Sequence, residues 1–299
     1  MAGKKNIELR IKKHKIQLES KLKNTLSKIE TPRVLKNVMS YSVLSGGKRI
    51  RPFILSEVAK LYNVSPQIYI FPCMAIEMVH CFSLIYDDLP CMDNDDIRRG
   101  KPTVHVKFNQ ANALLGGSSL LVFAYQLLVS DKFKVSQNIK NAIIKEFSSA
   151  IGAEGMLAGQ YLDLEAEDEN FKLTLRKLRK IQEMKTSLLI GLCTHTGAIL
   201  AKASKKDRDL LHKFGVILGR LFQIRDDILD QEGSEKEMGK KIKKDQKSNK
   251  ATVIRLKNIE YAKGELLRLS KNAKGLLNDF ERDTTILHKL IDYLTIRNC

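Results

Sequence analysis

Residues 222–230 read FQIRDDILD and residues 87–93 read DDLPCMD, so two acidic clusters lie on stretches otherwise rich in apolar residues. Asp226 and Asp230 are four positions apart, so on a helix their side chains project from one face, about 40° apart. Carboxylates stacked in this way repel each other, and beside an apolar neighbour such as Ile228 water screens the repulsion poorly. A cation must offset it, and Mg²⁺ is the simplest choice because this hard ion prefers oxygen ligands.

The first cluster needs a bend in the chain before its carboxylates can act together. Asp87 and Asp93 are six positions apart, which on an unbroken helix would point their side chains about 120° apart. Pro90 lies between them, and proline removes a helical donor and clashes with the preceding turn. We therefore expect the helix to end here and the chain to curl until Asp93 approaches Asp87. One acidic triplet is a weak signal for a metal, but two on apolar helices are much stronger.

The rest of the chain predicts an all-α fold. Residues 6–26 and 281–296 carry apolar side chains every three to four positions, and alternation of period two is scarce. With 299 residues, 43% of them hydrophobic, the chain can bury a large core. No linker rich in Pro, Gly or Ser divides it, so residues 1–299 are predicted to form a single domain, a helical bundle. The six prolines are expected at helix boundaries: Pro32, Pro52, Pro66, Pro72, Pro90 and Pro102.

The formal net charge of +18 suits nucleic acid, an anionic membrane or phosphorylated small molecules. The chain has no Trp, only 6% aromatic residues and no zinc-finger, RNP or basic-zipper pattern, so we expect no nucleic acid partner. A lysine-rich solvated surface accounts for the same charge without any partner. The five cysteines form no C-x-x-C pair and no signal peptide is recognisable, so a cytoplasmic location is expected.

Residues 108–130 carry no charge over a length that could cross a bilayer. Polar residues and two glycines interrupt them, and the strongly apolar part, LLVFAYQLLV, is short. We predict a buried helix of the bundle and no membrane span, with Ser118 as a helix cap after the glycine pair.

Cationic residues that could bind phosphate complete the pattern. Mg²⁺ held by few carboxylates usually binds substrate phosphates and water as well. Residues 46–52, GGKRIRP, offer three cations on a glycine-started turn, and residues 96–103, DIRRGKPT, place Arg98 and Arg99 just beyond the first acidic cluster. Residues 235–250 have almost no apolar content and are read as a solvated loop or, alternatively, as a cationic lid.

Taken in order, GGKRIRP, DDLPCMDNDDIRRGKPT, GQYLDL at 159–164, MKT at 184–186 and FQIRDDILD resemble the trans-prenyl diphosphate synthases, and most closely the bacterial farnesyl diphosphate synthases. The resemblance runs from about residue 25 to the terminal YLTIRN. It implies an all-α bundle around a deep central cavity, usually a homodimer. It also implies about three Mg²⁺ ions.

The resemblance assigns roles by matching position. Asp87, Asp93 and Asp226 resemble Mg²⁺ ligands, with Asp230 also assigned to the metal site and Asp88 and Asp227 in support. Lys48, Arg51, His80 and Arg99 resemble the clamp for the diphosphate of isopentenyl diphosphate. Arg98, Lys185, Thr186, Gln223 and Lys240 resemble contacts to the allylic diphosphate, and Lys185, Thr186 and Gln223 are also assigned to catalysis. Gln160 and Asp163 are expected on another cavity-facing helix, and Lys250 matches a lid lysine.

The activity implied is the condensation of isopentenyl diphosphate with dimethylallyl diphosphate and then geranyl diphosphate, giving farnesyl diphosphate. Phe82 lies five residues before Asp87, about 7.5 Å along a helix, and resembles the floor that limits product length. The alternatives are a geranylgeranyl or mixed-product synthase and a non-catalytic subunit of the same fold. The sequence departs from the family pattern at Tyr86, Asn94, Ser118, Lys243, Asn249 and Val253, and the last three weaken the lid assignment.

Overall fold

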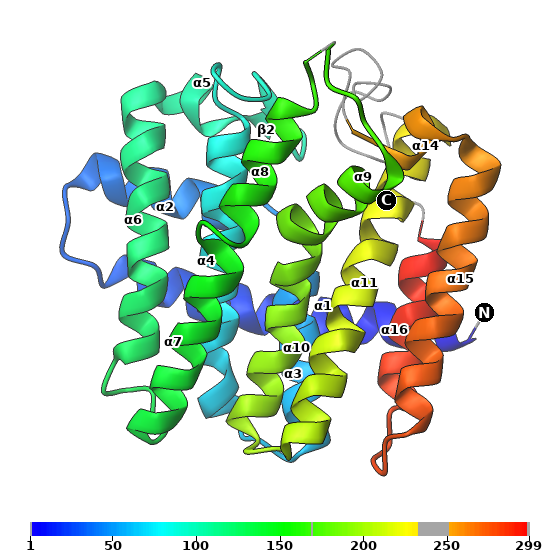
Figure 1. Ribbon diagram of the computed structural model, residues 1–299. Coiled ribbons are helices and arrows are strands. Elements are labelled where there is room, and N and C mark those ends of the chain that lie inside the picture. The colour runs from blue at the N-terminus through cyan, green and yellow to red at the C-terminus, as the bar shows by residue number, and fades with distance from the viewer. Residues whose placement is uncertain (1, 169, 233–250, 298–299) are drawn as a thin grey trace.

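The computed structural model describes residues 2–168, 170–232 and 251–297, and nearly all of its regular structure is helical (Figure 1). The longest helices are α1 (Ala2–Ser27), α4 (Pro66–Asp87), α6 (Gln110–Val129), α11 (Lys205–Glu232) and α15 (Ile259–Asn278). The others are α2 (Arg33–Leu44), α3 (Ile50–Leu61), α5 (Val104–Phe108), α7 (Gln137–Ile151), α8 (Met156–Glu165), α9 (Leu175–Gln182), α10 (Leu188–Leu200), α14 (Val253–Leu256) and α16 (Thr285–Ile296), with a π turn, η1 (Glu183–Ser187). Two short strands, β1 (Ile97–Arg98) and β2 (Lys101–Pro102), pair antiparallel. The all-α prediction is confirmed, and residues 235–250 lie outside the described part.

The upright helices stand side by side while α1 and α2 run across behind them (Figure 1). α4 packs against α3 and α6, and α11 packs against α10 and α15. The core between them contains fully buried aromatic side chains such as Phe53 on α3 and Phe214 on α11. Each fully buried side chain of this size stabilises the fold by roughly 1.5–3 kcal/mol relative to its exposed state. This packing fixes the ends of α4 and α11, which carry the acidic clusters.

Most of the prolines mark helix boundaries, but Pro72 does not. Pro66 opens α4 and Pro90 follows its end, as expected. Pro72 instead lies inside α4 and is buried. Tertiary packing thus overrides the ordinary cost of an internal proline, about 3 kcal/mol.

Ser118 does not cap a helix, because α6 begins eight residues earlier. Its cap is Asn109, whose side-chain oxygen accepts from the backbone N–H of Asn112 at 2.9 Å. The glycine pair instead allows close packing between helices: a Cβ on Gly117 of α6 would lie 2.7 Å from Cε2 of Tyr86 on α4. The Ser118 hydroxyl lies 2.8 Å from the Tyr86 hydroxyl, so two departures from the family pattern contact each other.

α6 is less buried than its sequence suggested. Both α4 and α6 are long and apolar enough to cross a membrane by length and composition alone. The most apolar window of α4 is 67% buried inside the fold, whereas that of α6 is only 39% buried. Four large side chains of α6 are exposed: Leu114, Leu115, Val122 and Val129. The prediction of a buried bundle helix is therefore wrong for one face of α6.

Candidate active site

A cavity of about 350 Å³ lies where the C-terminal end of α4 faces α8, η1 and α11. Eleven of the predicted residues line it: Arg51, His80, Phe82, Asp87, Arg98, Arg99, Gln160, Lys185, Thr186, Gln223 and Asp226. Asp93, Asp230 and Lys48 are not among its lining residues, and Lys240, Lys243, Asn249 and Lys250 lie outside the described residues. The fold thus gathers side chains from six separate stretches of sequence around one cavity.

The chain bends within the first acidic cluster, as its sequence with Pro90 predicted. α4 ends at Asp87, and the backbone N–H of Asp93 donates to the carbonyl oxygen of Asp87 at 2.8 Å. The turn brings Asp93 back to Asp87, although an unbroken helix would have separated their side chains. The bend depends on Pro90 and the turn after it, both visible in the sequence.

Asp88 is buried and bound by Arg98 within this cluster. Nε and Nη2 of Arg98 donate to one oxygen of Asp88 at 2.9 and 2.5 Å. Burial raises the pKa of Asp88 to about 6, and the positive charge of Arg98 opposes that rise. Part of the Arg98 guanidinium is therefore occupied by the protein itself, although the side chain still lines the cavity.

The second cluster exposes one carboxylate to the cavity and buries the other two. The Asp226 side chain is 35% exposed, whereas Asp227 and Asp230 are 3% and 4% exposed. Asp227 accepts from the side-chain amides of Gln182 and Gln223 at 3.4 and 3.1 Å. It also accepts from the backbone N–H of Val253 at 3.3 Å. Asp227 therefore joins α11 to the start of α14, and Asp226 is the cavity-facing acid of this cluster.

The donor set fits a hard divalent cation, but no compact cage is formed. Among the described residues, no three His, Cys, Asp or Glu side chains are grouped closely enough to hold a metal. Asp87 and Asp226 instead line the same cavity from α4 and α11. Carboxylates set apart in this way leave coordination positions for substrate oxygens and water, which is how Mg²⁺ is commonly bound.

Cationic side chains occupy another part of the wall. Arg51 lies 3.3 Å from Nε2 of His80. Burial, followed by the charges of Arg51 and Arg99, lowers the pKa of His80 well below its ordinary value, so the imidazole is neutral at pH 7. Arg99 donates to the carbonyl oxygen of Gly46, and a Cβ on Gly47 would lie 2.7 Å from the Arg99 guanidinium carbon. Gly47, with φ +109°, is thus required both for its conformation and for this close approach.

Lys185 and Thr186 lie on the π turn η1, which interrupts the regular helix between α9 and α10. Lys185 donates to Asp163 at 2.6 Å, and the Thr186 hydroxyl donates to the side-chain oxygen of Gln223 at 3.0 Å. Burial opposes the charge of Lys185, but Asp163, Asp87 and Asp93 outweigh it and raise the pKa of its ammonium group. Local π turns often occur at functional sites, and this one points Lys185 and Thr186 into the cavity.

Two arginines have contacts that the sequence did not reveal. Arg297, near the end of the chain, donates to Asp226 at 2.6 Å, and its guanidinium carbon lies 4.0 Å from the centre of the Phe222 ring.

Arg49 belongs to GGKRIRP, but its side chain is 0% exposed, so it is not a diphosphate contact. It pairs with Glu77 at 2.5 Å and Glu19 at 2.9 Å. No local pattern marks either contact, because each joins residues far apart in the chain.

The arrangement defines the class of protein, an all-α isoprenoid synthase fold with a cavity flanked by two acidic clusters. A family model described as polyprenyl synthetase matches residues 32–292. The chain belongs to the polyprenyl synthetase family.

Two relatives illustrate the similarity. The farnesyl diphosphate synthase of Bacillus subtilis (strain 168) is 42% identical over 284 residues, which cover 94% of this chain and 95% of the relative. The chloroplastic geranylgeranyl pyrophosphate synthase of Capsicum annuum is 37% identical over 271 residues, which cover 90% of this chain and 73% of the relative. Relatives with different named products therefore match nearly the whole chain.

Two solved structures share the fold. The FPP/GFPP synthase from Zymomonas mobilis, in its apo form, has a TM-score of 0.88 and 34% identity, covering 98% of this chain and all of that one. The geranyltransferase from Helicobacter pylori, complexed with magnesium and isoprenyl diphosphate, has a TM-score of 0.83 and 31% identity. It covers 95% of this chain and 94% of its own.

Proposed function

We propose that this chain is a Mg²⁺-dependent farnesyl diphosphate synthase that condenses isopentenyl diphosphate first with dimethylallyl diphosphate and then with geranyl diphosphate. The observation that carries the proposal is the convergence of Asp87 and Asp226 with Arg51, Arg99 and Lys185 on one cavity. Acids that can hold divalent cations and cations that can bind diphosphate are both needed for this reaction.

The reaction breaks the C1–O bond of the allylic diphosphate and forms a C–C bond from the alkene of isopentenyl diphosphate to C1. A proton then leaves, and the released pyrophosphate is its acceptor. Bound Mg²⁺, three ions by family resemblance, would neutralise charge on the departing pyrophosphate. Asp87, Asp93 and Asp226 are the proposed ligands, with Asp230 in support from its buried position.

The chain's own residues bind and orient the two substrates. Arg51, Arg99 and neutral His80 are assigned to isopentenyl diphosphate, together with Lys48 from the loop before α3. Arg98, Lys185 and Lys240 are assigned to the allylic diphosphate. The Thr186 and Gln223 oxygens, 3.0 Å apart, supply partial negative charge where the carbocation forms. The apolar wall keeps water from that cation.

Phe82 is proposed to limit the product to C15. It is 3% exposed, lines the cavity and packs against Tyr86 with ring centres 4.7 Å apart. A longer or mixed product is the second candidate, supported by the names of the pepper relative and of the Zymomonas structure. Chromatography of products made from labelled isopentenyl diphosphate and dimethylallyl diphosphate distinguishes the two.

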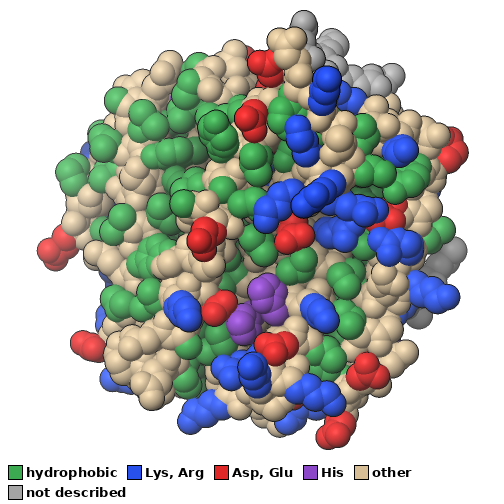
Figure 2. Space-filling view, in the orientation of Figure 1, with side chains coloured by type: hydrophobic (Ala, Val, Ile, Leu, Met, Phe, Trp, Pro, Cys, Tyr) green, Lys and Arg blue, Asp and Glu red, His purple; other side chains and the backbone are tan. Residues whose placement is uncertain are grey.

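We also infer a homodimer of single-domain chains, located in the cytoplasm. Three of the exposed apolar residues of α6, Leu115, Val122 and Val129, repeat every seven positions and so form one stripe along the helix. Hydrophobic side chains gather on the part of the surface where α6 and α7 lie (Figure 2). A second copy of the chain is the proposed cover for this stripe.

The function is tested with Asp87→Asn and Asp226→Asn. Each substitution keeps the side-chain size and removes the charge, so we expect kcat/KM to fall about 100-fold or more. Asp279→Asn, on the exposed cap of α15, is the control and should match the parent. Full activity of both site variants would overturn the proposal, as would failure of the parent to elongate dimethylallyl diphosphate. The second result would favour a non-catalytic subunit.

A further inference from the structure

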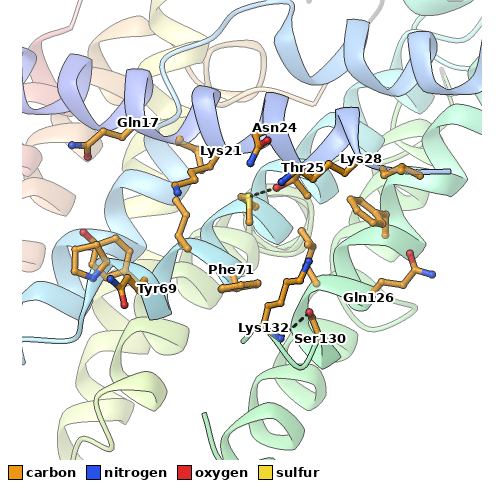
Figure 3. A pocket seen from close by; sticks show the side chains of 18 of the residues that line it. Gln17, Lys21, Asn24, Thr25, Lys28, Tyr69, Phe71, Gln126, Ser130 and Lys132 are labelled. Atoms are coloured by element: carbon orange, nitrogen blue, oxygen red, sulfur yellow. Dashed lines mark hydrogen bonds between the residues drawn. The ribbon is translucent and has the colours of Figure 1, made fainter. Parts of the chain in front are cut away.

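A second and larger cavity, of about 900 Å³, lies away from the candidate active site (Figure 3). It is enclosed by α1, the N-terminal part of α4 and the end of α6. In the part of the chain that the structure describes, no residue lines both cavities. α4 contributes residues 66–74 to this cavity and residues 80–87 to the other, so the two lie at opposite ends of one helix. Its volume is at the upper end of the range of small-molecule sites, about 300–1,000 Å³.

One part of the cavity wall is apolar. α4 supplies Ile70, Phe71 and Met74, and α6 supplies Phe123 and Leu127. Met74 is 4% exposed and Leu127 is 7% exposed, so these side chains are mostly buried behind the cavity surface. A wall of this kind favours a hydrocarbon chain, because burial of apolar surface stabilises a complex.

The rim is cationic. Lys21 comes from α1, Lys28 directly follows the end of α1, and Lys132 comes from the segment after α6, with Phe71 between them (Figure 3). No Asp or Glu among the described residues lines the cavity. Within residues 2–168, 170–232 and 251–297, none of the three ammonium groups has a hydrogen-bond or ion-pair partner. Three unneutralised ammonium groups around one opening favour a ligand with more than one negative charge.

Two further features add polarity suited to an anion. The N-terminus of α4, with Pro66 and Gln67, lies at the cavity, and a helix N-terminus carries partial positive charge. His14 on α1 also lines the cavity, is 6% exposed, and has no hydrogen-bond partner for Nε2 in the described part of the chain. A buried nitrogen without a partner is uncommon and is best explained by a ligand or water at the site.

We propose that this cavity is a second ligand site for an amphipathic anion, a single hydrocarbon chain that ends in a phosphate or diphosphate. The chain lies on the wall of α4 and α6, and the head group lies among Lys21, Lys28 and Lys132. A prenyl diphosphate made at the active site and an alkyl or acyl phosphate share this chemistry. Only the prenyl source rests on the proposed function, since the cavity itself does not depend on turnover.

The test is isothermal titration of the full chain with farnesyl diphosphate in EDTA, which removes metal-dependent binding at the acidic clusters. We expect binding that weakens about tenfold or more in Lys28→Ala/Lys132→Ala, because two charge-assisted contacts are lost. Lys12→Ala/Lys23→Ala removes equal charge from exposed positions of α1 outside the cavity and should bind like the parent. All four lysines are exposed, so neither double variant should disturb folding.

Three further ligands test separately the contributions of the head group and of the hydrocarbon chain to binding. Pyrophosphate, which has no chain, and farnesol, which has no charge, should each bind about tenfold or more weakly than farnesyl diphosphate. Dodecyl diphosphate keeps the head group and replaces the prenyl chain, so it identifies the source: equal binding indicates any alkyl chain, and weaker binding indicates the prenyl chain. The proposal is overturned if Lys28→Ala/Lys132→Ala binds as the parent does, or if pyrophosphate alone binds as tightly as farnesyl diphosphate. Neither result bears on synthesis, which is measured separately with Mg²⁺ present.

Discussion

Phe82 is the residue at which the proposed chain length can be tested most directly. Phe82→Ala removes the ring that packs against Tyr86 at one side of the cavity, so products longer than C15 should form. Chromatography of the dephosphorylated products measures this. Phe147→Ala, at a fully buried position of α7 away from the cavity, is the control for lost stability, which is about 3–5 kcal/mol for such changes. A C15 product from Phe82→Ala would remove Phe82 from the account.

His14 gives the fold a dependence on pH. Burial, assisted by the charge of Lys60, lowers the pKa of His14 to about 4. In the unfolded chain the imidazole takes up a proton below about pH 6.5, whereas in the folded protein it stays neutral down to about pH 4. Stability from this residue is therefore full above pH 6.5 and is lost as the pH falls toward 4, by up to about 3 kcal/mol. Urea unfolding of His14→Gln should show a shallower slope between pH 6.5 and 4.5; an unchanged slope would contradict this.

Some positions of the candidate active site could be predicted from the sequence, and others could not. Helix geometry and a turn proline predicted that Asp87 and Asp226 act within acidic clusters, and both line the cavity. The family resemblance was needed to assign Lys185, which also lines the cavity. The pairing of Arg297 with Asp226 does not follow, since 71 residues separate them and no local pattern records the contact. Long-range ion pairs depend on packing, which no motif encodes.

At the scale of elements, Arg49 joins α1 and α4 to the start of α3, between Lys48 in the preceding loop and Arg51 in the first turn of the helix. It precedes α3 and pairs with Glu77 on α4 and Glu19 on α1. Arg49→Met leaves Glu77 buried without its partner and should lower the free energy of unfolding by about 3–5 kcal/mol in urea titration.

Two further variants separate this effect from simple loss of charge. Arg49→Met/Glu77→Met removes both charges and should recover much of the lost stability. Lys263→Met breaks an exposed pair with Glu232 and should change stability by at most about 1 kcal/mol. Equal losses in Arg49→Met and Lys263→Met would show that burial of the Arg49 pair does not matter.

The start of α14 is coupled to the second acidic cluster by one backbone hydrogen bond, from Val253 to Asp227. Val253→Pro removes that donor at the first residue of a helix, where proline fits, and the preceding Thr252 already has the extended backbone that proline requires (φ −118°, ψ 158°). Loss of a hydrogen bond to a buried carboxylate should lower kcat about tenfold, with little change in melting temperature. Val253→Ala keeps the N–H and is the matched control. Equal kcat in the two variants would exclude a role for this bond.

Helices themselves were predictable and their exposure was not. The three-to-four-residue spacing of apolar side chains predicts α1 and α16, and the structure contains both. The Gly116–Gly117 pair misled the cap assignment, because glycine signals both a helix boundary and close packing between helices. The half-exposed face of α6 also escaped prediction, since a charge-free sequence does not show which face lacks a neighbour.

For the whole molecule, the uncovered stripe of α6 predicts assembly. Leu115, Val122 and Val129 are 61%, 59% and 53% exposed on one line, and large exposed apolar patches usually mark interfaces. Val122→Glu places a charge at the centre of the stripe, and burial of that charge without a partner is costly, so the dimer should dissociate. Light scattering after size exclusion should then give the mass of one chain, 34.0 kDa, in place of twice that value.

Ile16→Glu, at an equally exposed position of α1 (59%), is the matched control and should leave the mass unchanged. If Val122→Glu and the parent had the same mass, the stripe would not be the dimer surface. Because α6 also packs against α4, which carries the first acidic cluster, the same experiment with activity as a second readout shows whether the active site depends on the partner.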